Sequence, residues 1–341
     1  MILLFIAGYL ALRRLPYPNV QNGEFLFAGN DLEARGASIF SVREISGKGK
    51  GVIAVRNIKR GEQLIRERPL FILPSEIIIS PTALIAHHLS LLTSDQYFQF
   101  YNLSYVNFSP HLNPETDLAE LALAIFQTNA VSAGVNSVGV FPRMARVNHG
   151  CSSAFNSVYT WREKEGVLVV HALKDIGKGQ EILTTYTDTK RPRDQRREFL
   201  RHQYSFHCTC DICSLPDEKS KISDHRLMTM SELYAKFATW GNSEIDGVQA
   251  IEIAQRIWEL GNEEGYLSER GRLAADAAWI AAAHSHAVST KAWARVAEEW
   301  FGYEVGVDSE QVLEMRALQT YPEGHLAWAS RQAMQVPAPT I

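Results

Sequence analysis

The spacing of apolar residues changes twice along the chain and predicts two kinds of structure. Short apolar and β-branched runs, bounded by glycine-rich or polar turns, predict strands in the first half of the chain. These predicted strands cover residues 39–42, 51–57, 63–66, 138–141, 158–161, 167–172 and 181–185. Before residue 138 apolar residues recur at helical spacing, which predicts a helical insert over about residues 80–127.

From about residue 224 the strand pattern ends, and amphipathic helical patterns continue to about residue 335. The predicted helices cover residues 227–240, 248–260, 267–288, 291–299 and 311–318, with glycines between several of them. Short links between amphipathic helices favour antiparallel hairpins, as in helical repeat arrays. The predicted fold class is therefore α+β, with several small β-sheets followed by an all-α, repeat-like C-terminal domain.

Residues 1–36 form a separate region, an apolar N-terminal segment followed by an irregular lead-in. Residues 1–12 precede Arg13 and Arg14, whereas a secretion signal carries its positive charges before the apolar run. As a helix, twelve residues would span only about 18 Å, which is short of a bilayer core. The segment is interpreted as a packed helix, a weak membrane anchor or a consequence of the assigned start. Membrane association through residues 1–12 is disfavoured but stays open.

The composition is that of a globular protein. With 341 residues, 46% hydrophobic and 21% charged, the chain is long enough for a large core and two domains. Its net charge of −4 provides no overall positive field for nucleic-acid binding. A basic run from Lys190 to Arg201 is interrupted by Asp194 and Glu198. This pattern favours a solvated helix face over a phosphate-binding patch or an acidic-partner patch.

The cysteines carry the strongest chemical signal. Cys208, Cys210 and Cys213 form a C-x-C-x-x-C pattern, and Cys151 is the one remaining cysteine of the four. Three thiolates on one tight turn leave one vertex of a tetrahedral zinc site open, and Cys151 can fill it. Unrelated buried thiols or a disulfide are the alternatives, but such spacing in an intracellular chain more often means metal.

Several motifs follow one another in a recognisable order. They are a glycine-rich turn and strand at residues 47–55, Asn148-His149-Gly150-Cys151, a strand ending at Tyr186, and the cysteine turn preceded by Phe206. Together they resemble the SET-domain protein-lysine methyltransferases, in detail the SMYD-like and fungal branch. The resemblance covers about residues 37–215. It implies SET-type small sheets with a knot-like core over residues 37–189, and a post-SET helix and zinc turn over residues 190–216.

The resemblance implies methyl transfer from S-adenosylmethionine to a lysine side chain of a protein substrate, histone or non-histone. The implied cofactor-binding residues are Lys48, Gly49, Lys50, Asn129, Asn148, His149 and Phe206, with Phe206 stacking on the adenine. Tyr186 would stand at the transfer point, and Tyr204 would line the lysine channel. The implied Zn²⁺ ligands are Cys151, Cys208, Cys210 and Cys213.

The chain departs from the family pattern in two places. The cysteines that would build the MYND zinc finger of SMYD proteins are absent, and residues 152–156 replace the usual Asp-Pro-Asn after Cys151. A function of another class is therefore kept as the alternative, a catalytically silent SET-like scaffold that binds partners through its C-terminal helices. Either function is expected inside the cell, in the cytoplasm or nucleus. The substrate, the degree of methylation and the oligomeric state have no signal in the sequence.

Overall fold

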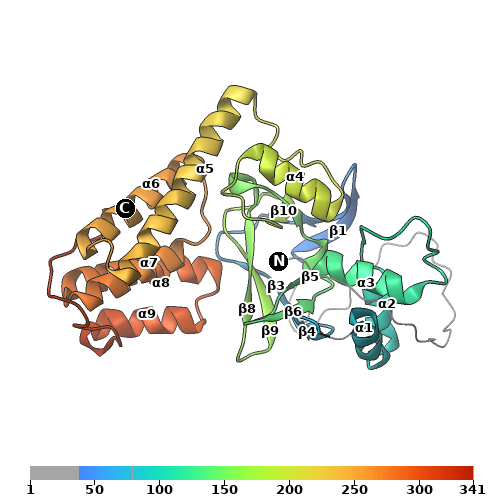
Figure 1. Cartoon of the computed structure of the whole chain (residues 1–341), viewed down its shortest axis with the longest axis horizontal. Helices are drawn as coiled ribbons and strands as arrows, with labels where there is room; N and C mark the ends of the chain where they lie inside the picture. Colours follow the sequence, from blue (N-terminus) through green and yellow to red (C-terminus); the bar gives the residue numbers. More distant parts are fainter. Residues whose placement is uncertain (1–37, 79, 341) are drawn as a thin grey trace.

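The computed structural model describes residues 38–78 and 80–340, and three parts lie side by side in it (Figure 1). The sheets form the middle part, the helical insert lies on one side, and the C-terminal helices lie on the other. This arrangement is the predicted α+β class. The apolar segment and lead-in predicted over residues 1–36 lie outside the described residues. Within the described residues, every helix is too short or too polar to cross a membrane.

The first sheet brings the Asn148-His149 pair next to the strand that leads to Tyr186. Its strands are β1 (Phe40–Ile45), β2 (Gly49–Ala54), β10 (Glu181–Thr184) and β7 (Asn148–His149), in the order β1-β2-β10-β7. β1 and β2 form the predicted antiparallel hairpin around a glycine-rich turn. β7 runs parallel to β10, with Asn148 opposite Leu183 and His149 opposite Thr184. This pairing joins two motifs that lie far apart in the sequence.

Two smaller sheets complete the middle part. One contains β3 (Gln63–Glu67), β9 (Val167–Ala172) and β8 (Ser157–Arg162), in the order β3-β9-β8. The other contains β4 (Ile72–Pro74), β6 (Ser137–Val140) and β5 (Ala130–Ser132), in the order β4-β6-β5. All six residues of β9 are buried, which explains why its sequence is apolar except for His171 and does not alternate with exposed polar residues. Val52, Leu64, Phe141 and Leu168 belong to the core of this part.

The predicted insert is helical. It consists of α1 (Pro81–Ser90), α2 (Ser94–Tyr101) and α3 (Leu118–Asn129). α2 begins with a capping box, because Thr93 and Gln96 each accept the other's backbone N–H through their side chains. The apolar faces of the insert pack around Ile85, Phe100 and Ile125. α3 continues directly into β5, which places Asn129 at the junction of helix and sheet.

The basic run forms α4 (Arg193–Tyr204), which ends at Ser205 in the left-handed region with φ 56°. The expected solvated face is only partly observed. Arg196 is fully buried, and its Nη1 donates to Asp224 Oδ1 at 3.0 Å. Arg197 donates to the carbonyls of Cys208 and Cys213 at 3.2 and 2.7 Å. The basic side chains of α4 therefore join the cysteine turn to the C-terminal helices.

The C-terminal part consists of α5 (Asp217–Ala238), α6 (Gly247–Glu264), α7 (Arg270–Ala283), α8 (Ala287–Glu304) and α9 (Glu310–Thr320). The prediction of one helix over residues 267–288 is wrong. α7 ends at Ala283 because Ser285 takes a left-handed φ of 59°, and α8 begins two residues later. The helical core includes Phe155 and Leu173 from the sheet part. The sheets and the C-terminal helices therefore share one apolar core.

Candidate functional site

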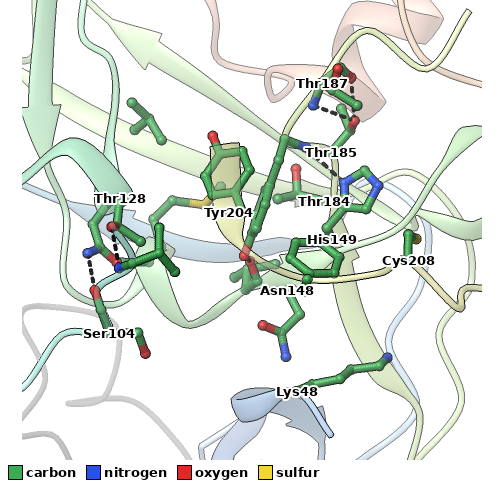
Figure 2. Close-up of a pocket in the computed structure, with 18 of the residues that line it drawn as sticks. Lys48, Ser104, Thr128, Asn148, His149, Thr184, Thr185, Thr187, Tyr204 and Cys208 are labelled. Carbon is green, nitrogen blue, oxygen red and sulfur yellow. Dashed lines mark hydrogen bonds between the residues drawn. The ribbon is translucent and has the colours of Figure 1, made fainter. Parts of the chain in front are cut away.

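A cavity of about 760 Å³ opens where the first sheet, the end of α3 and the cysteine turn meet. In Figure 2, Ser104 and Thr128 lie on one side of it, and His149 and Cys208 lie on the other. Its volume is within the range of cofactor pockets, roughly 300–1,000 Å³. The cavity brings together most of the predicted site residues: Lys48, Lys50, Asn129, Asn148, His149, Tyr186, Tyr204 and Phe206.

Gly49 is the predicted cofactor residue that does not line the cavity. It is exposed, with φ 68°, and an added Cβ would meet no atom within 4 Å. Because this φ is unfavourable for residues with a side chain, the glycine allows the chain to turn between Lys48 and Lys50. Its contribution in this structure is to backbone conformation.

Tyr186 follows β10 and has its hydroxyl held by the backbone. The hydroxyl donates to the carbonyl of Val147 at 2.8 Å, and the Tyr186 and Tyr204 ring centroids lie 5.0 Å apart. Burial, followed by the nearby Tyr204, raises the pKa of Tyr186. The hydroxyl therefore stays protonated at neutral pH. Because its hydrogen is directed to Val147, its lone pairs are left to accept a further hydrogen bond.

His149 lies at one side of the cavity, and its side chain connects two other groups. Its Nδ1 accepts the backbone N–H of Tyr186 at 3.0 Å, and its Nε2 lies 3.0 Å from Cys151 Sγ. An Nδ1 that accepts cannot carry the proton of a neutral imidazole, so that proton is on Nε2 and faces the sulfur. Burial lowers the pKa of His149 to about 4, which keeps the ring neutral.

Asn129 and Lys50 form the cavity wall near the helical insert. Asn129 Nδ2 donates to the carbonyls of Ser104 and Ile125, both at 2.7 Å. Lys50 Nζ donates to Asn102 Oδ1 at 3.1 Å. Burial, with the positive charge of Arg146 as a second cause, lowers the pKa of Lys50. Both side chains are thus tied to the insert before any ligand is present.

Two cavity-side residues were not predicted as functional. Tyr159 lies on β8 and lines the cavity, and Glu181 at the start of β10 contacts two of the predicted cofactor residues. The sequence places both on apolar strands, where they resemble ordinary strand positions. Tyr159 and Glu181 could have been found from the sequence only as polar or phenolic residues on strands that are otherwise apolar.

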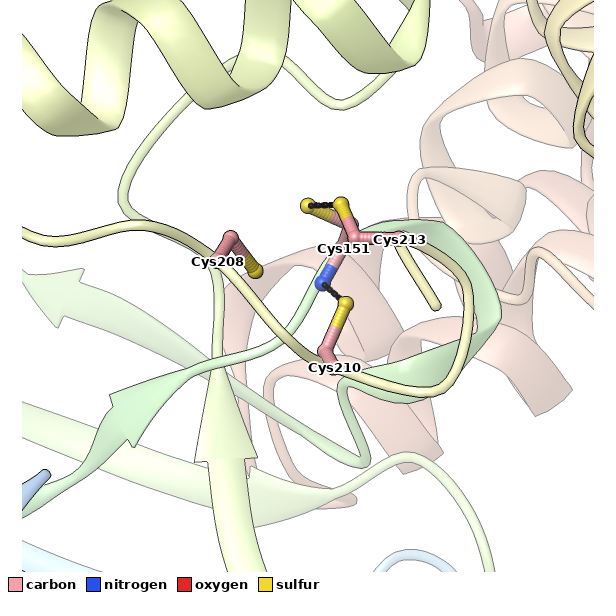
Figure 3. A group of neighbouring side chains, drawn as sticks. All are labelled: Cys151, Cys208, Cys210 and Cys213. Atoms are coloured by element: carbon pink, nitrogen blue, oxygen red, sulfur yellow. Dashed lines mark hydrogen bonds between the residues drawn. The ribbon is translucent and has the colours of Figure 1, made fainter. Parts of the chain in front are cut away.

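The four cysteines come together as predicted. Their Sγ atoms all lie within 4.8 Å of one another, and the Cys151 and Cys213 sulfurs are 3.6 Å apart (Figure 3). All four side chains are buried and unlinked by disulfides. A Zn–S distance of about 2.3 Å gives a tetrahedron with S–S edges of about 3.8 Å. The observed spacing fits a metal-bound tetrathiolate and is too long for a disulfide, with its S–S bond of about 2.05 Å.

The loop after Cys151 contacts the C-terminal helices. Ser152 takes a left-handed φ of 47°, and its hydroxyl donates to Glu264 Oε1 at 3.0 Å. Ser223 of α5 donates to the same oxygen at 2.6 Å. Glu264 is 7% exposed, so these hydroxyls satisfy a carboxylate that has little access to water. The loop at residues 152–156, where the sequence departs from the family pattern, therefore contacts α6 through Ser152.

Comparisons with known proteins identify the middle part. A family model described as "SET domain" matches residues 49–187. The histone-lysine N-methyltransferase set5 of Schizosaccharomyces pombe is 33% identical over 189 residues, which are 55% of this chain and 54% of that protein. The N-lysine methyltransferase SMYD2-B of Danio rerio is 34% identical over 116 residues, which are 34% of this chain and 26% of that protein.

One solved structure that matches is "Structure of the Neurospora SET domain protein DIM-5, a histone lysine methyltransferase". The match covers 45% of this chain and 54% of the DIM-5 chain. The identity there is 20% and the TM-score is 0.25. The chain spans about half the length of set5 and smaller shares of the other curated relatives. This chain thus carries a SET domain, and it is related through that domain to proteins named lysine methyltransferases.

Proposed function

We propose that the chain is an S-adenosylmethionine-dependent methyltransferase that acts on lysine side chains of protein substrates. The observation that carries this proposal is the cavity in which Asn148, Tyr186, Tyr204 and Phe206 meet next to the cysteine cluster. The relatives' names support lysine as the acceptor. The same names favour a location in the nucleus or cytoplasm, where such substrates occur.

The cavity suits a cofactor with a charged amino-acid end and an aromatic base. Lys48 and Asn148 offer a cation and an amide at one end, and Phe206 offers an aromatic face beside the cysteine turn. Bound there, S-adenosylmethionine would supply an electrophilic methyl group on a sulfonium. The enzyme's own task is then to hold the amine in line and to exclude water.

Tyr186 fits the role of orienting the amine. Its hydroxyl oxygen can accept an N–H from the incoming lysine because its own hydrogen is donated to Val147. Because its pKa is raised, Tyr186 stays protonated at neutral pH and cannot accept the proton of the lysine, so its role is to position the nucleophile. Tyr204 and Tyr159 line the same cavity and fit the walls of a lysine channel, where burial would lower the pKa of the lysine.

The cysteine cluster fits a structural zinc. The four sulfurs would occupy all four positions of a tetrahedral zinc, so no position would be open for substrate. Cys208 and Cys210 also line the cavity. Zinc bound there would fix the turn that carries Phe206. Arg196, buried against Asp224 and electrostatically coupled to Cys151 and Cys213, would offset the negative charge of a zinc tetrathiolate.

The alternative is a silent scaffold that binds a partner through the C-terminal helices. Two measurements separate the two functions: calorimetric binding of S-adenosylmethionine, and transfer of a radiolabelled methyl group to proteins of a cell extract. An enzyme should bind the cofactor and label specific proteins at lysine. A zinc-loaded protein that binds no cofactor and labels nothing would leave the scaffold as the function.

A further inference from the structure

We propose that Glu181 is a positioning residue that orients the amide of Asn148 toward the amino-acid end of the cofactor. This inference rests on the proposed function and adds a residue to it. Glu181 does not line the cavity; it lies behind Asn148, at the first position of β10. Its role is therefore to act through Asn148, without touching the cofactor itself.

The two oxygens of Glu181 hold two different donors. Oε1 accepts from Asn148 Nδ2 at 2.9 Å, and Oε2 accepts from Lys48 Nζ at 2.6 Å. The Glu181 side chain is only 15% exposed, so these contacts are shielded from water more than a surface ion pair. One carboxylate thus connects the glycine-rich turn, β10 and β7.

The carboxylate decides which way the Asn148 amide faces. An ionised carboxylate only accepts hydrogen bonds, so the NH₂ group of Asn148 must face Glu181. The amide oxygen then faces away from Glu181. Within residues 38–78 and 80–340, no side chain or backbone group donates to that oxygen. Since Asn148 lines the cavity, the oxygen is an acceptor available to the ammonium group of an amino-acid ligand.

Gly51 leaves the room that this contact needs. A Cβ at Gly51 would lie 2.3 Å from Ile45 Cδ1, 2.6 Å from Asn148 Nδ2 and 2.9 Å from Glu181 Oε1. All three distances are below normal contact, and Gly51 lies on β2, which pairs with β10. Since its backbone needs no positive φ, the glycine at this position leaves space for the Asn148–Glu181 contact as well as for the Ile45 side chain.

The test replaces Glu181 with glutamine, which keeps the shape but offers one acceptor oxygen to two donors. Calorimetry would measure the affinity for S-adenosylmethionine and for 5′-methylthioadenosine, which lacks the amino-acid end. We expect Glu181→Gln to weaken S-adenosylmethionine binding about tenfold, the usual scale of one charge-assisted hydrogen bond. Binding of 5′-methylthioadenosine should stay within about twofold of wild type. Glu62→Gln is the matched control, because Glu62 pairs with Arg56 away from the cavity.

A double-mutant cycle separates positioning from general damage. In an Asn148→Ala background, Glu181→Gln should cost much less affinity than in wild type, since the group it orients is gone. Equal loss in both backgrounds, or equal loss for both ligands, would overturn the positioning role. Unchanged affinity in Glu181→Gln would overturn it as well. If the wild-type protein binds neither ligand, the proposed function itself fails, and this outcome is distinct from the others.

Discussion

Two side chains beside the cavity are each held in one protonation state by their surroundings. His149 is neutral, with its Nδ1 occupied by the Tyr186 N–H and its Nε2 directed at Cys151. Tyr186 is protonated, with its hydroxyl hydrogen directed at Val147. His149 thus links the backbone of the proposed catalytic tyrosine to a proposed zinc ligand. A shift of Cys151 would therefore be passed to the backbone of Tyr186 through the imidazole of His149.

The first prediction concerns the Tyr186 hydroxyl. Tyr186→Phe keeps the ring and its contact with Tyr204 but removes the oxygen that would orient the amine. If the hydroxyl acts mainly in the transition state, the methyl-transfer rate should fall on the order of 10²-fold. Cofactor affinity should stay close to wild type. Single-turnover rates and calorimetry on both proteins test this, and equal rates would make Tyr186 a packing residue.

At the scale of residues, the sequence predicts the site residues that belong to recognisable motifs. It does not predict residues whose role depends on contacts with positions distant in the sequence. Asn148, Tyr186 and Phe206 were predicted to share one site, and all three line the cavity. Glu181 was not, because its partners lie 33 and 133 residues away in the chain. Only the β2-β10-β7 pairing brings them together, and β7 is too short to leave an apolar pattern.

At the scale of elements, the cysteine turn is a loop between α4 and α5 that belongs to neither helix. It follows the left-handed Ser205 and is attached to α4 through Arg197. Its sulfurs are buried against Leu200, Phe206 and Ile212. Four close thiols without a metal would repel one another once ionised. The folded form of this turn is therefore expected to depend on zinc.

The second prediction follows from that dependence. Purified protein should contain about one zinc per chain. Cys210→Ser removes one sulfur ligand, so zinc should be lost and cofactor binding weakened through the loosened Phe206. Elemental analysis and calorimetry measure the two effects. Active protein without zinc would contradict the metal assignment.

The third prediction concerns the helix that supports the loop after Cys151. Glu264→Ala would leave the hydroxyls of Ser152 and Ser223 without their acceptor in a buried place. The unfolding free energy should fall by about 2–4 kcal/mol, and a chelator should remove zinc faster. Glu263→Ala is the matched control, because Glu263 is exposed and pairs with Arg226 and Arg256 at the surface. Equal effects of the two changes would show that the buried contact has no special role.

Elements were predictable where one pattern covered several turns or a whole strand. The run at residues 167–172 coincides with β9, and the helix predicted at residues 248–260 lies within α6. The break between α7 and α8 was missed, because alanine-rich sequence supports a helix on both sides and Ser285 is an uncommon residue for a left-handed turn. Such a break is decided by packing between helices, which a one-dimensional pattern does not contain.

At the scale of the whole molecule, the C-terminal helices are joined to the SET domain by polar contacts as well as by the shared core. Arg162 of β8 donates to both oxygens of Asp308 at 2.9 and 2.7 Å. Lys190 pairs with Glu269 at 3.0 Å, with the Tyr266 ring centroid 5.4 Å from its ammonium. These contacts, with Glu264, connect several places on the SET domain to the helices. Removal of the C-terminal helices would therefore remove contacts that support the walls of the proposed cofactor site.

The last prediction is a pH dependence of global stability. Glu304 at the end of α8 accepts the backbone N–H groups of Arg270 and Gly271 at the start of α7, at 2.9 and 3.3 Å. Burial is the main cause that raises its pKa to about 8, with the negative charge of Glu269 adding to it and Arg270 opposing it. In the unfolded chain the pKa returns to about 4.5. Between these values the folded state binds more protons than the unfolded state, so stability is greatest below about pH 4.5 and falls as the pH rises toward 8.

Glu304→Gln mimics the protonated carboxyl and still offers an oxygen to the two N–H groups. At pH 5.5, one unit above the unfolded pKa, the wild type should already be about 1.4 kcal/mol less stable than the variant. Between pH 5.5 and pH 8.5 the wild type should lose on the order of a further 3 kcal/mol relative to the variant, since one unit of pKa shift is about 1.4 kcal/mol. Urea unfolding at both values measures the difference. Glu299→Gln, on the exposed face of the same helix, is the matched control and should follow the wild type. A wild-type slope with pH no steeper than that of Glu304→Gln would mean that Glu304 stays ionised in the folded protein, because its two backbone donors would then outweigh the burial.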